Sequence, residues 1–147
     1  MTTRLINPQG LALIKGFEGL RLQAYKDPAG VWTIGYGHTG GVHKGDVITA
    51  DEAERLLIQD LADAENWVGA RTQAPTGNQF AAMVSLTLNI GNAAFLGSSV
   101  RRLHNEGNFA GAADAFLLWD KAHVNGQLVV VQGLLNRRHA ERAFYLS

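Results

Sequence analysis

Two carboxylic acids and a hydroxyl lie close together near the N-terminus of the chain, at Glu18, Asp27 and Thr33. A glycosidic bond is commonly broken by a proton donor on one side of the sugar and a second carboxylate on the other, around an oxocarbenium-like transition state. The three side chains fall within sixteen residues of sequence. Their types and spacing therefore predict hydrolysis of a glycosidic bond.

The segment before Glu18 has the features of a helix. Asn7 can cap this helix and Pro8 suits its first position. Leu11, Ile14 and Glu18 then recur at helical spacing, so that they share one face. A carboxyl group on an apolar face is disfavoured in its charged form, as a proton donor near neutral pH requires. We therefore expect Glu18 to be the general acid.

After Gly19 the apolar spacing changes to a period of two, which predicts a β-hairpin with its turn at residues 27–30. Asp27 lies at the tip of this hairpin, where solvent keeps a carboxylate ionised. Thr33 follows on the returning strand. We expect Asp27 and Thr33 to hold a water molecule on the face of the sugar opposite Glu18. Each residue alone would suit an ordinary turn, strand or helix end, so the inference depends on all three together.

The run from Phe17 to Thr39 resembles the catalytic segment of the phage-type lysozymes, the muramidase endolysins of tailed bacteriophages and their prophages. In that family a Glu is followed by eight residues, an Asp, five residues and a Thr, and then by Ile-Gly-x-Gly-His. Residues 18–38 contain every element at this spacing. Further similarity at residues 48–54, 88–91 and 136–142 extends the resemblance over nearly the whole chain.

The resemblance implies an α+β, lysozyme-like fold in a single domain, residues 1–147. A small N-terminal lobe that contains the β-hairpin, at about residues 15–48, would be joined by a long helix, at about residues 49–69, to a larger all-helical C-terminal lobe. Residues 70–147 and the N-terminal helix would form this larger lobe. The substrate cleft would then lie between the two lobes.

Local signals agree with a mainly helical chain after residue 48. Capping boxes begin at Thr49 and Thr76, and the second opens an apolar helix that ends at Gly91. The segment 123–131 contains an Asn-Gly turn signal and β-branched residues. Relatives in the family have a loop there, so we expect a loop.

The resemblance also implies an activity. It implies an endolysin that hydrolyses the β-1,4 bond between N-acetylmuramic acid and N-acetylglucosamine of bacterial peptidoglycan and lyses the host cell for phage release. Glu18 would protonate the leaving oxygen, while Asp27 and Thr33 would position or activate the attacking water in a single displacement. Inverting enzymes of this kind hold their carboxyl groups roughly 6.5–9.5 Å apart. No metal or organic cofactor is expected.

Substrate binding is predicted at Asn89 and Gly30. The position that matches Asn89 presents a cleft amide in the family, and an equally ordinary role for such a residue is a capping or buried amide. Gly30 lies in the turn after Asp27 and is assigned to the same binding surface.

Charged residues outside the catalytic run have predicted supporting roles. Asp60 interrupts the apolar stripe of the long helix, where an unpaired carboxylate is costly. The resemblance implies that its partner is His38, and the alternative is a His38 bonded only to backbone. In the family an arginine near the start of the last helix approaches the catalytic glutamate, which points to Arg137 in preference to Arg138. Most arginines at such positions are solvated or pair locally.

Composition excludes several classes of function. The 147 residues suffice for one core or two small lobes, and 46% hydrophobic residues is ordinary for a globular protein. The chain has no cysteine, so it uses neither disulfides nor thiolate metal clusters. The 13 basic and 13 acidic side chains cancel, and no basic cluster suggests a nucleic-acid partner. We expect a monomer.

The N-terminal segment, Met1–Pro8, has no apolar run long enough for a signal peptide or a membrane span. We therefore expect a protein without stable membrane insertion that accumulates in the host cytoplasm. It would depend on a holin-type pore to reach peptidoglycan in the periplasm or cell wall.

Three other functions are compatible with parts of this pattern. A lytic transglycosylase would use the acid without an activated water, and the presence of both Asp27 and Thr33 argues against it. A wall-binding module without catalysis would more readily have lost one of the three residues. The third alternative is a structural or regulatory relative, used as an anchor or in a tail device.

Overall fold

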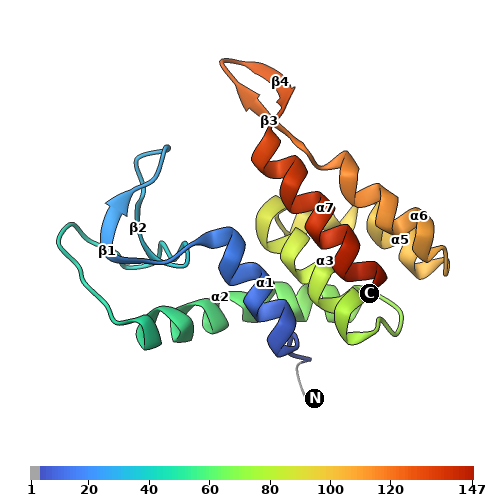
Figure 1. Cartoon of the computed structure of the whole chain (residues 1–147), viewed down its shortest axis with the longest axis horizontal. Helices are drawn as coiled ribbons and strands as arrows, with labels where there is room; N and C mark the ends of the chain where they lie inside the picture. The colour runs from blue at the N-terminus through green and yellow to red at the C-terminus, as the bar shows by residue number, and fades with distance from the viewer. Residues whose placement is uncertain (1–3) are drawn as a thin grey trace. The chain divides into compact units, whose positions relative to one another are not determined.

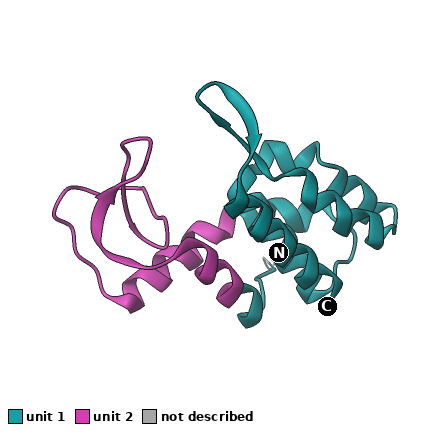
Figure 2. Cartoon of the chain, turned by 45° about the horizontal axis from the view of Figure 1, so that its top comes forward, with its two compact units in different colours: residues 1–10, 64–147 teal, residues 11–63 magenta. Residues whose placement is uncertain are grey.

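The computed structural model describes residues 4–147, and its helices and strands are labelled in Figure 1. Contacts divide the chain into two compact units (Figure 2). Unit 1 comprises the residues up to Gly10 together with Ala64–Ser147, and unit 2 comprises Leu11–Asp63. Within residues 4–147, no helix is both long and apolar enough to cross a membrane. Residues 1–3 of the segment considered for a signal peptide lie outside the described residues.

Helix α1, Pro8–Glu18, has the predicted cap and is followed by a glycine. Asn7 Oδ1 accepts a hydrogen bond of 2.8 Å from the backbone N–H of Gly10. At the other end, the N–H of Gly19 donates to the Lys15 carbonyl at 3.0 Å, and Gly19 has a φ of 70°. A glycine adopts this left-handed conformation without strain, so the helix ends directly after Glu18.

The predicted β-hairpin follows in unit 2. Strands β1, Arg21–Lys26, and β2, Trp32–Gly35, pair antiparallel. Tyr25 lies opposite Thr33, and the pairing is irregular between Arg21 and Tyr25. Helix α2, Ala50–Arg71, begins in unit 2 and ends in unit 1. Its predicted cap is present, because the N–H of Glu52 donates to Thr49 Oγ1 at 3.1 Å. Unit 2 has a small core from both elements, made of Ile34, Ala53, Leu57 and Leu61.

Unit 1 is mainly helical and is built around the predicted apolar helix, α3, Gly77–Ile90. Its capping box is complete, because Thr76 and Gln79 bond each other's backbone N–H. Helix α3 packs against α7, Gln132–Leu146. The remaining helices are α4, Asn92–Leu96, α5, Ser99–Asn105, α6, Phe109–Ala115, and the 3-10 turn η1, Phe116–Leu118. Phe80, Met83, Leu86, Phe95, Phe116 and Tyr145 form the core of the unit.

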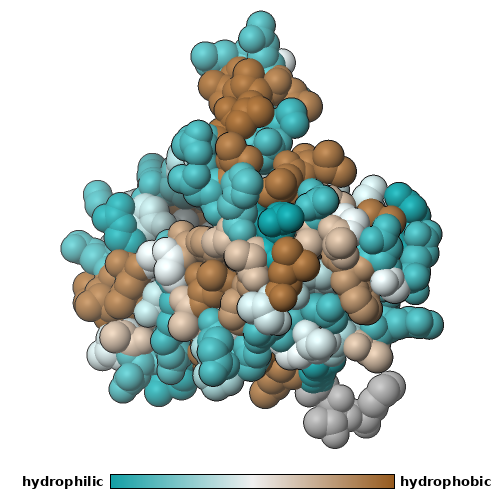
Figure 3. Space-filling model, turned by 45° about the vertical axis from the view of Figure 1, so that its right-hand side comes forward, coloured by the Kyte–Doolittle hydropathy of each residue, from teal (hydrophilic) through white to brown (hydrophobic). Residues whose placement is uncertain are grey.

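The expected loop at residues 123–131 is wrong, because this segment forms most of a second hairpin. Strands β3, Lys121–Val124, and β4, Gln127–Val130, pair antiparallel through a two-residue turn. Asn125 and Gly126 have φ values of 51° and 80°, as a type I′ turn requires. The local Asn-Gly signal therefore overrides the family's loop. This hairpin projects from unit 1 and exposes the aliphatic side chains Val124, Leu128, Val129 and Val130 (Figure 3).

Candidate active site

Glu18 is the last residue of α1 and is half-buried in unit 2. Its carboxyl group lies against the backbone of Gly37, where an added Cβ atom would stand 3.2 Å from Glu18 Oε2. Gly37 has a φ of 83°, which independently favours glycine. The turn after β2 therefore leaves space for the Glu18 carboxyl group.

Lys15, one helical turn before Glu18, ties α1 to α2 inside unit 2. Its ammonium group pairs with Glu54 and lies 5.7 Å from the ring centre of Tyr36. The hydrogen bond to Glu54 raises the pKa of Lys15 above its ordinary value. Sequence reasoning missed this pair, because Lys15 and Glu54 are 39 residues apart and no spacing rule connects them. The pair fixes the part of α1 from which Glu18 projects.

Asp27 is half-buried at the turn of the first hairpin, and its side chain organises that turn. Asp27 Oδ1 accepts hydrogen bonds of 2.9 Å from the N–H groups of Ala29 and Val31. The N–H of Gly30 donates to the Asp27 carbonyl at 2.8 Å. Within residues 4–147, no donor bonds Oδ2 of Asp27. One carboxylate oxygen, Oδ1, thus holds the turn.

Thr33 is only 3% exposed, and its hydroxyl donates to the Val31 carbonyl at 2.9 Å. Val31 therefore bridges the two side chains, since its N–H is bound by Asp27 and its carbonyl by Thr33. Because the Thr33 proton is used in this bond, the hydroxyl oxygen can accept a hydrogen bond from another group. Sequence reasoning missed the bridge, because Val31 carries it through its backbone.

His38 and Asp60 form a pair within unit 2. His38 Nδ1 lies 2.8 Å from Asp60 Oδ2, and His38 Nε2 lies 2.8 Å from the Gly40 carbonyl. The ring therefore bonds both the carboxylate and the backbone, so the two interpretations offered by the sequence describe different nitrogens of one residue.

The remaining predicted residues lie in unit 1. Asn89 is exposed near the end of α3, and its side chain makes no hydrogen bond to the part of the chain that the structure describes. Arg137 and Arg138 lie inside α7, which begins at Gln132 and so earlier than the sequence suggested. The predicted approach of an arginine to Glu18 stays a prediction.

Glu141 holds both arginines in a buried cluster that the sequence did not reveal. Its Oε2 accepts from Ser85 Oγ at 2.5 Å, from Arg137 Nε at 3.2 Å and from Arg138 NH2 at 3.1 Å. Its Oε1 lies 2.7 Å from Arg138 Nε, in ion-pair contact without the alignment of a hydrogen bond. Arg137 also donates to the Ser85 carbonyl. The spacing of three and four residues on α7 was the available signal.

Burial sets the electrostatics of this cluster. It raises the pKa of Glu141 above its ordinary value, although both arginines act in the opposite direction. Burial likewise lowers the pKa of Arg138, which is wholly buried. In contrast, Arg137 keeps 8% of its surface exposed. Among the described residues, no group of three or more His, Asp or Glu side chains could hold a metal ion.

Comparison with known proteins gives a match to the family described as phage lysozyme over residues 15–141. The chain belongs to the phage lysozyme family. It is 45% identical to an endolysin of Acyrthosiphon pisum secondary endosymbiont phage 1, over 97% of this chain and 98% of that protein. It is 43% identical to an endolysin of Salmonella phage P22, with the same coverage of both chains.

Solved structures confirm the predicted lysozyme-like α+β fold. An endolysin from Escherichia coli O157:H7 phage FAHEc1 aligns with a TM-score of 0.95 and 41% identity, over 99% of this chain and 96% of that chain. The muramidase domain of SpmX from Asticaccaulis excentricus aligns with a TM-score of 0.92 and 43% identity, over 98% of this chain and 99% of that chain. Membership in the family supports a lytic role as a lysozyme-type glycoside hydrolase.

Proposed function

We propose that the protein is a muramidase endolysin that hydrolyses the β-1,4 bond between N-acetylmuramic acid and N-acetylglucosamine in bacterial peptidoglycan. The observation that carries this proposal is the bridge through Val31, which fixes Asp27 and Thr33 in one hairpin directly after the helix that ends at Glu18. Hydrolysis by inversion requires a general acid and a carboxylate base, which Glu18 and Asp27 supply, and Thr33 adds a hydroxyl acceptor for the water.

The hydrogen bonds at the hairpin suit the positioning of an attacking water. A water that donates one proton to Asp27 Oδ2 and the other to Thr33 Oγ1 keeps its lone pairs free for the anomeric carbon. Thr33 can accept this proton because its own is donated to the Val31 carbonyl. Asp27 then takes up the proton that the water loses as the new carbon–oxygen bond forms.

Glu18 supplies the proton to the leaving oxygen. Its place against Gly37 and the fixation of α1 by Lys15 hold the acid while a substrate binds. The bond to the leaving sugar breaks as Glu18 protonates its oxygen, and the water attacks from the opposite face, which inverts the anomeric carbon. A separation of roughly 6.5–9.5 Å between the two carboxyl groups would admit this water.

The other predicted residues take supporting roles in the proposal. Asn89 and Gly30 bind the glycan, the former through an exposed amide and the latter in the turn that Asp27 organises. The pair of His38 and Asp60 is structural, because both nitrogens of the ring are used inside unit 2. Arg137 is preferred over Arg138 as the arginine of the site, since Arg138 is wholly buried.

In the proposed biology, the protein accumulates in the host cytoplasm as a monomer and reaches the peptidoglycan through a holin-type pore. Fractionation of cells that express the chain alone, with and without a holin, tests this part. We expect activity in the periplasm only when the holin is present. Periplasmic activity without a holin would contradict the dependence.

Substitution of the three residues tests the chemistry. We expect Glu18→Gln and Asp27→Asn to lower the rate of glycan cleavage by about 10²–10⁴-fold, in line with loss of a general acid or base. Asp114→Asn, an exposed carboxylate of α6, is the matched control and should leave the rate unchanged. Proton NMR of the first product tests inversion at the anomeric carbon. Full activity of Glu18→Gln, or a product with retained configuration, would contradict the assigned roles.

A further inference from the structure

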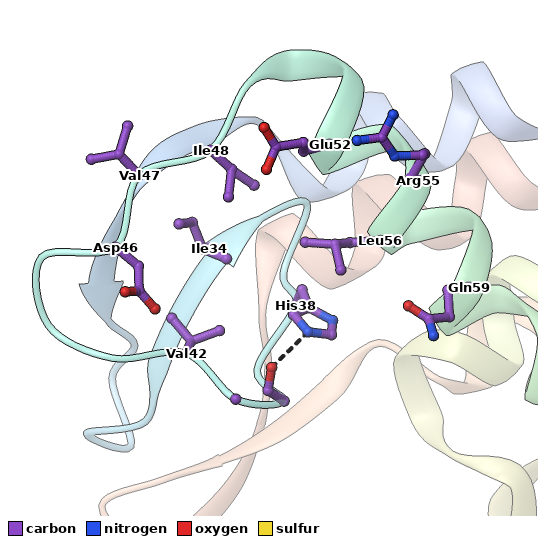
Figure 4. Close-up of a pocket in the computed structure, with 12 residues that line it drawn as sticks. Ile34, His38, Val42, Asp46, Val47, Ile48, Glu52, Arg55, Leu56 and Gln59 are labelled. Carbon is purple, nitrogen blue, oxygen red and sulfur yellow. Dashed lines mark hydrogen bonds between the residues drawn. The ribbon is translucent and has the colours of Figure 1, made fainter.

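Unit 2 contains a pocket of about 580 Å³ that no predicted site residue other than His38 lines (Figure 4). It lies between the segment 38–48 and the first half of α2. The interior is aliphatic, formed by Ile34, Val42, Val47, Ile48 and Leu56. Its volume falls within the range of small-molecule sites, about 300–1,000 Å³.

The pocket is on the other face of β2 from the catalytic hydroxyl. Ile34 lines the pocket and directly follows Thr33 on this strand. Successive side chains of a strand point to opposite faces of the sheet, so Thr33 and Ile34 face opposite ways. Neither Glu18 nor Asp27 lines the pocket. The pocket is therefore separate from the catalytic residues.

Opposite charges flank the aliphatic interior. Arg55 and Gln59 project from one face of α2, and neither side chain has an ion pair or hydrogen bond within residues 4–147. Asp46 lies across the pocket on the loop, where its Oδ2 accepts from the N–H of His43 at 2.8 Å (Figure 4). Glu52 adds a second carboxylate, which accepts from the Thr49 hydroxyl. Helix α2 thus presents a cation, an amide and the Glu52 carboxylate to the pocket. The loop presents the carboxylate of Asp46, whose Oδ2 also lies 3.8 Å from His43 Nδ1.

We propose that this pocket binds a short zwitterionic peptide with small apolar side chains. The peptide's carboxylate would contact Arg55, its amine would contact Asp46, and its methyl groups would lie on Ile48 and Leu56. The inference rests on the proposed function, because peptidoglycan carries stem peptides in which a diamino acid precedes a terminal D-alanine. Both the amine and the carboxylate are free only in stems that are not cross-linked. The pocket therefore retains the enzyme on uncross-linked wall.

Binding of a soluble stem mimic tests the proposal. The probe is Nα-acetyl-Lys-D-Ala-D-Ala, which keeps a free side-chain amine and a free carboxylate. We expect it to shift the backbone NMR signals of Val42, Ile48 and Gln59 in the wild-type protein. Acetylation of the amine or amidation of the carboxylate should each weaken binding about fivefold or more, as loss of a charge-assisted contact at a partly exposed site does.

Two variants assign each charge to its partner. Arg55→Gln should bind the acid and the amide of the probe equally and still distinguish the free from the acetylated amine. Asp46→Asn should bind the probes with a free and an acetylated amine equally and still distinguish the acid from the amide. Arg102→Gln, an exposed arginine of α5, is the control and should bind all three peptides as the wild type does. The proposal would be overturned if the probe left the NMR signals of the pocket residues unshifted. It would also be overturned if the wild type bound all three peptides equally.

This test is independent of catalysis. If the wild-type protein binds the probe but releases no muropeptides, the proposed muramidase activity is contradicted and the proposal that the pocket binds a peptide still holds. A wild-type protein that cleaves peptidoglycan but does not bind the probe would contradict the pocket assignment alone.

Discussion

Glu141→Gln should destabilise the protein strongly, because it removes the only carboxylate of the described buried cluster on α7 without changing its volume. Glu141 and Arg138 are both 0% exposed, and Arg137 is 8% exposed. In the native protein the carboxylate compensates two guanidinium charges and accepts a bond from Ser85. The amide removes the negative charge and leaves both guanidinium groups in place. It offers one oxygen acceptor where the carboxylate offered two, and it turns an NH2 group toward other donors.

Loss of one partner of a buried ion pair costs about 3–5 kcal/mol, because the other charge stays desolvated. No cavity term is added, since glutamine has nearly the size of glutamate. For a chain of this length, the unfolding entropy is about 0.3 kcal/mol per degree near the transition, so the Tm should fall by about 10–16 °C. This loss is a large part of the free energy of unfolding of a typical folded domain, which is about 5–15 kcal/mol.

Urea denaturation followed by circular dichroism measures the change in the free energy of unfolding. The matched control is Arg142→Gln on the same helix, which breaks the exposed pair with Asp114. An exposed pair of this kind contributes about 0–1 kcal/mol. A loss below 1 kcal/mol for Glu141→Gln, equal to that of the control, would refute the argument that the buried carboxylate compensates both arginines.

Three further predictions follow from described contacts. Burial lowers the pKa of His104, which donates to the Gln73 carbonyl and accepts from Tyr145, so the unfolded chain takes up a proton first as the pH falls. The contribution of His104 to the free energy of unfolding should therefore be fully present above about pH 6.5 and decrease below it, by at most about 1.4 kcal/mol per pH unit. Denaturation of His104→Asn at several pH values should show a smaller decrease. Gly37→Ala and Gly45→Ala should each lower the free energy of unfolding by about 1 kcal/mol in urea denaturation, because both glycines have positive φ. Only Gly37→Ala should lower kcat, since only its Cβ would approach Glu18. Gly126→Ala should increase hydrogen exchange in β3 and β4 without changing the global Tm, because the hairpin's strands are mostly exposed; unchanged exchange would contradict the type I′ turn.

Local signals explain why much of the fold could be predicted. The caps at Asn7, Thr49 and Thr76 act over three residues, and the structure has each of them. The first hairpin follows from a two-residue period and a turn. The second hairpin was missed only because the family's loop was given more weight than the Asn-Gly signal, whose two positive φ values the structure shows.

Long-range contacts explain what could not be predicted. Lys15 meets Glu54, and Ser85 meets Glu141 across 56 residues of sequence. Pairings of this kind depend on how helices pack, which periodicity does not specify. The bridge at Val31 was hidden for another reason, since its backbone makes both bonds and any residue but proline could supply them.

Mass spectrometry of the muropeptides that the wild-type chain releases from purified peptidoglycan distinguishes hydrolysis by water from the other possible functions. We expect fragments with reducing N-acetylmuramic acid ends, because a water held by Asp27 and Thr33 completes the cleavage. Fragments with anhydro ends would show a transglycosylase, and the release of no fragments would show a binding or anchoring role. Either result would contradict the proposed muramidase activity.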